Sequence, residues 1–120
     1  TNREHRVPLT NRMLEIIDEC ETDSGYLFAE RGNPLSINAL RMLMKRMGVG
    51  EYTPHGFRSS FRNWCSSDGP NGNFEIWESA LSHTVGTSVT AAYLRSDHLC
   101  DRRRLMQGWE TYIGRGLMQS

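Results

Sequence analysis

Hydrophobic residues recur at three- and four-residue steps along most of this chain, which is the spacing of helices that bury one face. The pattern predicts helices over residues 11–20, 37–47, 54–66, 74–82, 88–95 and 97–113. Thr10, Ser36 and Thr53 each precede a predicted helix, where a hydroxyl can accept a hydrogen bond from the first turn. Pro54 suits the first helical position, because its missing N–H is not needed there. The sequence therefore predicts a mainly helical fold.

Two short stretches predict strands instead. Residues 3–9 form the first, which Pro8 confines to an edge or an end of a sheet because proline cannot donate to a ladder. Residues 26–28 form the second. Glycine and polar residues predict a loop at 68–73 and a turn at 84–86. The expected fold class is α+β, mainly α with a small β element.

The apolar faces of the predicted helices define the expected core. Its side chains are those of Met13, Leu14, Ile16, Ile17, Ile37, Leu40, Met44, Met47, Phe57, Phe61, Trp64, Cys65, Trp77, Leu99, Met106, Trp109 and Ile113. We expect His5 and His98 at the surface. The arginine run 102–104 either contacts DNA or is solvated on an exposed helix face, and the sequence leaves both interpretations open.

The chain has 120 residues and a mass of 13.8 kDa, which is the size of one domain. With 38% hydrophobic and 23% charged residues it is neither disordered in bulk nor membrane-embedded. Three cysteines, Cys20, Cys65 and Cys100, lack Cys-x-x-Cys spacing. A disulfide framework and a zinc module are therefore disfavoured. We expect packed or free thiols, no metal, no cofactor, no membrane association and a cytoplasmic location.

Charge is balanced overall, with 14 basic and 14 acidic residues, but it is unevenly distributed. Residues 41–66 carry an excess of four positive charges and residues 92–115 an excess of two, whereas residues 1–40 carry an excess of three negative charges. All the basic residues except Lys45 are arginines, whose planar fork matches phosphate oxygens. Ordinary composition explains the same counts, so charge alone does not identify nucleic acid as the partner.

His55 and Arg58 form the first candidate site. At the start of a predicted helix and three residues apart, they project from one face beside backbone N–H groups and the positive end of the helix dipole. Gly56 between them leaves room for close approach. The arrangement suits a phosphate, which Arg58 binds with paired hydrogen bonds while His55 donates or accepts a proton. By itself this spacing is not specific.

His83 and Tyr93 form the second candidate site. A tyrosine in a helix is most often a packing residue, and this interpretation stays open for Tyr93. As a nucleophile its phenol, with an ordinary pKa of about 10, costs about 4 kcal/mol to ionise at pH 7. Cationic neighbours supply part of that energy if the fold brings Arg58, His55 and His83 to the tyrosine.

The order of three short segments resembles the tyrosine recombinases, the phage-integrase family. These segments are His55-Gly56-Phe57-Arg58, Leu81-Ser82-His83 and Ala91-Ala92-Tyr93. The stretches that resemble integrases of prophages and satellite phages are 3–9, 53–64, 80–83, 89–95 and 101–109. The resemblance covers nearly the whole chain and implies a tyrosine-recombinase catalytic domain.

The resemblance also implies a mechanism for site-specific DNA recombination, in prophage integration and excision. Tyr93 attacks a DNA phosphodiester and forms a 3′-phosphotyrosyl link. Arg58 holds the phosphate, His55 acts as general acid and base, and His83 hydrogen-bonds the phosphate. Arg62 and Arg95 are the further residues expected to contact DNA.

The family site includes an earlier arginine and a hairpin lysine, both of which are expected before Thr1. The chain therefore resembles the C-terminal portion of a catalytic domain truncated at its N-terminal side. Its expected parts are a strand remnant at 1–9, a helical catalytic part at 10–95, and a C-terminal helix and tail at 97–120. We expect this portion to be inactive alone.

The expected partners follow from the same resemblance. The full-length protein is expected to form a tetramer on double-stranded DNA attachment sites, associated with the bacterial nucleoid. The portion given by this chain is expected to be a monomer. In this family the segment after the tyrosine often docks on a neighbouring protomer, so 97–120 is a candidate exchange element.

Three other interpretations remain. The first is a non-catalytic helical DNA-binding module that uses Arg41, Lys45, Arg46 and Arg62. The second is an inert prophage remnant. The third is a cysteine or metal enzyme based on Cys65 or residues 98–100, whose spacing matches no established pattern.

Overall fold

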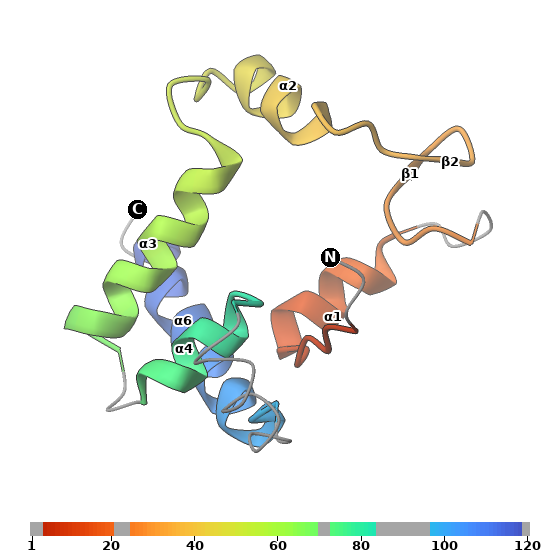
Figure 1. Ribbon diagram of the computed structural model, residues 1–120. Helices are drawn as coiled ribbons and strands as arrows, with labels where there is room; N and C mark the ends of the chain where they lie inside the picture. The colour runs from red at the N-terminus through yellow and green to blue at the C-terminus, as the bar shows by residue number, and fades with distance from the viewer. Residues whose placement is uncertain (1–3, 21–24, 70–72, 84–96, 119–120) are drawn as a thin grey trace. The chain divides into compact units, whose positions relative to one another are not determined.

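The computed structural model describes residues 4–20, 25–69, 73–83 and 97–118. Its elements in chain order are α1 (Asn11–Asp18), β1 (Ala29–Glu30), β2 (Asn33–Pro34), α2 (Ala39–Arg46), α3 (Pro54–Ser67), α4 (Phe74–Ala80) and α6 (Leu99–Met118) (Figure 1). The described residues are mainly helical with one small sheet, which confirms the predicted proportion of helix and strand. The turn predicted at 84–86 and the helix predicted at 88–95 lie outside the described residues. No described helix is both long and apolar enough to cross a bilayer.

The chain divides into two compact units, although its length predicts one domain. Unit 1 comprises Thr1–Thr10 and Phe61–Ser120, and unit 2 comprises Asn11–Ser60. Unit 2 is thus inserted between the first ten residues and the remainder of unit 1. The boundary falls within α3, so the start of this helix belongs to unit 2 and its second part to unit 1.

The core of unit 1 is built from the second part of α3, from α4 and from α6. Its buried residues are Phe61, Trp64, Cys65, Leu81 and Leu105. Trp109 of α6 packs edge-on against Phe61, with ring centroids 5.5 Å apart, and lies 5.3 Å from the ring of Trp64. These contacts confirm the predicted core positions Phe61, Trp64 and Cys65 on α3 and the predicted packing role of Trp109, whereas Phe57 of the same helix is exposed.

The inward face of α6 differs from the predicted one. Leu105 is 3% exposed and Arg102 only 2%, whereas Ile113, a predicted core residue, is 50% exposed. The buried line passes through Arg102, Leu105, Met106 and Trp109, which follow one another at helical steps. A hydrophobic pattern could not identify this line because one of its positions is an arginine.

Helix boundaries in the structure have local causes. Thr53 Oγ1 accepts a hydrogen bond from Gly56 N at 3.1 Å, which confirms the predicted cap and start of α3. The helix predicted at 74–82 ends at Ala80, and Ser82 then has a φ of 61°, which ends helical hydrogen bonding. His98 has a φ of 55°, and α6 begins at Leu99 rather than at 97 and continues to Met118.

Unit 2 buries little of the apolar surface assigned to it. Among its described residues only Met44, at 8% exposed, is buried. The expected core side chains that are exposed instead are those of Leu14, Ile16, Ile37, Leu40, Met47 and Phe57. The helix predicted at 37–47 begins at Ala39, with Asn38 at its N-cap, so Ile37 precedes the helix and is 99% exposed.

Both predicted strands are wrong in position. Residues 4–9 form neither helix nor strand, because the carbonyl of Arg6 accepts a hydrogen bond from the guanidinium of Arg102 and not from a neighbouring strand. The second strand lies just after 26–28, where β1 pairs antiparallel with β2. Arg31 and Gly32 connect the two with φ of 51° and 81°, the left-handed conformation that a tight hairpin requires.

Candidate functional site

His55 and Arg58 lie in the first turns of α3, within unit 2, and both side chains are exposed. Pro54 and the Thr53 cap fix the start of the helix, and a spacing of three residues places the two side chains on one face. The N–H of Gly56 is already used, since it donates to Thr53 Oγ1 at 3.1 Å and meets the Thr53 carbonyl at 3.0 Å. An anion would therefore be bound here by side chains and not by this amide.

His83 follows α4, within unit 1, and is held by a carboxylate that the sequence analysis did not single out. His83 Nδ1 lies 2.6 Å from Glu78 Oε2, and Arg62 Nε donates to Glu78 Oε1 at 2.9 Å. We call these three residues the Glu78 cluster. The side chain of Glu78 is 15% exposed, that of Arg62 32% and that of His83 50%, so the carboxylate is the shielded centre of the cluster.

The electrostatics of this cluster keep Glu78 ionised. Burial alone would raise the pKa of Glu78, but hydrogen bonds and charges from His83 and Arg62 outweigh burial and lower the pKa below its ordinary value. The guanidinium of Arg62 also lies over the rings of Phe74 and Trp77, 4.8 and 5.1 Å from their centroids. Arg62, which the sequence predicts to contact DNA, is thus engaged by protein groups on two sides, and its DNA contact stays a prediction.

Tyr93 and Arg95 lie outside the described residues. It stays a prediction that one phosphate is contacted by Tyr93, His55, Arg58 and His83. Tyr93 is not among the described residues, and His55 and His83 belong to different units. On the N-terminal side of this segment, His83 is bound to Glu78 as above.

On the C-terminal side of the Tyr93 segment, Asp97 is held by an arginine network. Arg6 donates to both carboxylate oxygens of Asp97 at 2.8 Å, and these hydrogen bonds lower the pKa of Asp97. Arg102 donates to the carbonyls of Arg6 and Asp97, the second at 3.3 Å, and its guanidinium lies 3.8 Å from the Asp97 carboxylate. The network fixes the start of α6 against residues 4–10.

Arg102 corrects the interpretation of the arginine run. Arg103 and Arg104 are exposed, as both interpretations require, but Arg102 is neither solvated nor available to DNA, because its side chain is buried in the network with Asp97. Residue type alone does not separate the three arginines. The signal that could have found Arg102 is its helical spacing to Leu105 and Trp109.

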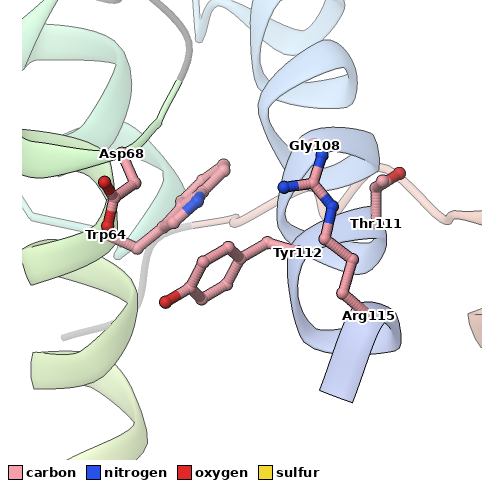
Figure 2. A pocket seen from close by; sticks show the side chains of 6 residues that line it. All are labelled: Trp64, Asp68, Gly108, Thr111, Tyr112 and Arg115. Atoms are coloured by element: carbon pink, nitrogen blue, oxygen red, sulfur yellow. The ribbon is translucent and has the colours of Figure 1, made fainter. Parts of the chain in front are cut away.

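Two hollows in the described residues contain none of the predicted catalytic side chains. In unit 1, a hollow of about 570 Å³ is lined by Trp64, Asp68, Gly108, Thr111, Tyr112 and Arg115 (Figure 2). In unit 2, a hollow of about 560 Å³ is lined by Asn38, Arg41, Met42, Lys45 and Gly50. The second places Arg41 and Lys45, one helical turn apart on α2, at the same depression.

The cysteine and metal interpretations receive no support from the described part of the chain. Burial raises the pKa of the Cys65 thiol to about 11, so at neutral pH it is protonated and a poor nucleophile. No group of three or more histidine, cysteine or acidic side chains gathers there in a way that could hold a metal ion. All three cysteines are free, as predicted.

Sequence comparison relates the chain to several named proteins. It is 33% identical to prophage integrase IntA of Escherichia coli K12 in an alignment of 120 residues, and this alignment covers 93% of this chain and 28% of that protein. It is 32% identical to the integrase of Enterobacteria phage P4, over 92% of this chain and 27% of that protein. It is 28% identical to the integrase of Shigella phage Sf6, over 91% of this chain and 30% of that protein. The chain thus spans less than a third of the length of each relative. No family model and no solved structure matches it.

Proposed function

Because this chain belongs to the phage integrase family, we propose that it is part of a site-specific DNA recombinase that breaks and rejoins DNA through Tyr93. The observation that carries this proposal is the match to named integrases over more than nine-tenths of the chain. The proposal takes the chain to be the C-terminal portion of a tyrosine-recombinase catalytic domain. Residues 10–95 are then its helical catalytic part and residues 97–120 its C-terminal helix and tail.

The proposed chemistry is a phosphoryl transfer to tyrosine. The phenol oxygen of Tyr93 attacks phosphorus while its proton passes to His55, and the bond from phosphorus to the 5′ oxygen breaks. The departing 5′ oxygen takes a proton from the hairpin lysine that the family site requires. The products are a 3′-phosphotyrosyl link and a DNA strand with a free 5′-hydroxyl. Attack by the 5′-hydroxyl of another strand reverses the step and joins the strands, so the phosphotyrosine conserves the energy of the bond.

Arg58 and His83 are proposed to bind the phosphate. Arg58 donates to the non-bridging oxygens, whose negative charge grows in the transition state, and His83 adds a hydrogen bond. The exposed start of α3 supports this role, because Arg58 and His55 share one face of the helix and are accessible to a ligand as large as DNA. Arg95 is proposed to contact the DNA backbone near Tyr93.

The partners of the whole protein are proposals as well. We propose a tetramer on double-stranded attachment-site DNA in the bacterial cytoplasm, and a monomer for the 120 residues alone. The earlier arginine and the hairpin lysine that the family site requires are assigned to another part of the whole protein. We therefore expect the 120 residues alone to leave DNA uncleaved.

A covalent trapping experiment tests the catalytic proposal. In a hybrid protein, these 120 residues replace the matching segment of the phage P4 integrase, and the hybrid is incubated with nicked attachment-site DNA of that phage. We expect a protein–DNA adduct that survives denaturation, that is absent for Tyr93→Phe and that forms about 10² to 10³ times more slowly for Arg58→Ala.

A matched control is Tyr112→Phe, because Tyr112 is stacked on Trp109 with ring centroids 5.8 Å apart and has no assigned role in the chemistry. This variant is expected to form the adduct at the unchanged rate. An adduct that persists in Tyr93→Phe, or a folded hybrid that forms none, would contradict the proposal.

A non-catalytic DNA-binding module is the second candidate function. The observation that favours it is the hollow in unit 2, where Arg41 and Lys45 lie one helical turn apart. Under this alternative, Arg41→Glu and Lys45→Glu weaken DNA binding by the 120 residues. The same trapping experiment separates the two functions, because this alternative forms no covalent adduct.

A further inference from the structure

We propose that Glu78 is a positioning residue that holds the ring of His83 through Nδ1, so that His83 meets the DNA phosphate with Nε2. This inference rests on the recombinase function proposed above. It adds a residue that touches neither DNA nor the reacting atoms and that acts through His83.

Glu78 holds both the backbone and the ring of His83. The N–H of His83 donates to the Glu78 carbonyl at 2.8 Å, and His83 Nδ1 lies 2.6 Å from Glu78 Oε2. Ser82, with a φ of 61°, turns the chain between them so that a residue beyond the end of α4 faces back to the helix. The ring position is therefore determined by a residue five places earlier in the chain.

The contact also determines which ring nitrogen carries a proton. An ionised carboxylate only accepts hydrogen bonds, and the hydrogen-bonded charges around Glu78 keep it ionised. At a distance of 2.6 Å, Nδ1 of His83 must then be the donor. The side chain of His83 is 50% exposed, and we assign its second ring nitrogen, Nε2, to the DNA phosphate.

Phosphate oxygens accept hydrogen bonds and do not donate them. His83 can therefore donate to a phosphate from Nε2 only when both ring nitrogens carry protons, that is, as the imidazolium. The negative charge of Glu78 at Nδ1 balances that positive charge at short range. Glu78 thus provides both the orientation and the counter-charge that the phosphate contact of His83 requires.

Arg62 in turn fixes the carboxylate. Its Nε donates to Glu78 Oε1, so each carboxylate oxygen has its own partner and the carboxylate cannot rotate without breaking a hydrogen bond. The rings of Phe74 and Trp77 under the guanidinium hold Arg62 from another side. At metal centres, partners that orient a ligating histidine typically contribute 10- to 100-fold to affinity or activity, and we expect an effect of that order from Glu78 on His83.

The first test is the tautomer of His83, measured by ¹⁵N–¹H correlation spectra of the 120 residues at a pH where the ring is neutral. We expect the His83 signals of the Nδ1–H form, assigned by their loss in His83→Asn. In Glu78→Met, which keeps side-chain length but has no acceptor, the signals should shift towards the Nε2–H form that free histidine prefers. A dominant Nε2–H form in the unsubstituted chain would overturn the proposal without any variant being needed.

The second test is a double-mutant cycle on covalent adduct formation by the hybrid protein. Glu78→Met is expected to slow adduct formation roughly 10-fold or more, yet to have little further effect when His83 is already alanine. A merely structural role would slow both backgrounds equally and would overturn the proposal. Glu75→Met, on the same helix, is the matched control and is expected to leave the rate unchanged.

The two tests also separate this inference from the proposed function. If the hybrid forms no Tyr93-dependent adduct, the recombinase function and the positioning role both fail, whatever the tautomer. If the adduct forms but the cycle shows no coupling of Glu78 to His83, only the positioning role fails. Tryptophan fluorescence of each variant verifies that unit 1 is folded.

Discussion

Replacing Arg102 by alanine is expected to lower the free energy of unfolding of unit 1 by about 2 to 4 kcal/mol. The side chain is 2% exposed, donates to the carbonyls of Arg6 and Asp97, and lies 3.8 Å from the Asp97 carboxylate. Each hydrogen bond from a charged donor contributes about 1.5 to 3 kcal/mol, and the substitution leaves the Arg6 carbonyl without this donor. The expected loss is smaller than the sum of the two hydrogen-bond energies, because Arg102 Nε is buried and has no hydrogen-bond partner in the described structure. Removing this unsatisfied donor removes its desolvation cost and offsets part of the loss.

The assay is urea unfolding followed by tryptophan fluorescence. All three tryptophans lie in unit 1, so the signal reports on the unit that contains Arg102. Arg103→Ala is the matched control, because its exposed side chain should change the free energy of unfolding by less than about 0.5 kcal/mol. Arg102→Lys should recover only part of the loss, since an ammonium lacks the fork that reaches two carbonyls. If Arg102→Ala and Arg103→Ala unfold within about 0.5 kcal/mol of each other, the buried network does not stabilise the unit.

Three further predictions concern unit 1. The pKa of Glu78 in the folded chain is below its ordinary value of 4.5. Ionised Glu78 therefore stabilises unit 1 above pH 4.5, and this stabilisation is lost as the pH falls through the lower pKa of the folded state. In a plot of unfolding free energy against pH, Glu78→Met should flatten the curve over this acidic range. With a thiol-reactive dye at pH 8, Cys100 should react in the native chain and Cys65 only after urea is added, and equal rates would contradict the burial of Cys65. In urea unfolding, Gly69→Ala should lower the free energy of unfolding of unit 1 by about 1 to 3 kcal/mol, because a Cβ at this position would lie 3.0 Å from the backbone of α3. Gly114→Ala, whose Cβ would meet open space, should raise it by up to about 1 kcal/mol.

The elements that the sequence predicts best are those whose signals are local. Thr53 and Pro54 define the start of α3 within two residues, and the Phe61 and Trp64 face follows from helical spacing alone. The common helix face of His55 and Arg58 is predicted for the same reason, since one turn of helix fixes it, while their role in the chemistry stays a prediction. The proportion of helix to strand is also a sum over local signals.

The features that sequence reasoning missed depend on contacts between distant residues. The sequence predicts a strand at 3–9, but the carbonyl of Arg6 in this segment accepts a hydrogen bond from Arg102, almost a hundred positions away. The burial of Arg102 itself depends on Asp97 and on the packing of α6. Glu78 contacts His83 only because Ser82 adopts a left-handed backbone that turns His83 towards it, and no composition or periodicity encodes that turn.

The bond between Thr10 and Glu110 has a consequence for how the polypeptide is made. Thr10 Oγ1 donates to Glu110 Oε1 at 2.6 Å across 100 positions of sequence. Ribosomes add about 5 to 20 residues per second, so Thr10 waits roughly 5 to 20 s for Glu110 to be synthesised. Unit 2 is complete well before that, and it can collapse while unit 1 still lacks its last helix. The residues of unit 2 can thus fold first, and the hydrogen bond between the two distant parts of unit 1 forms only after Glu110 has been synthesised.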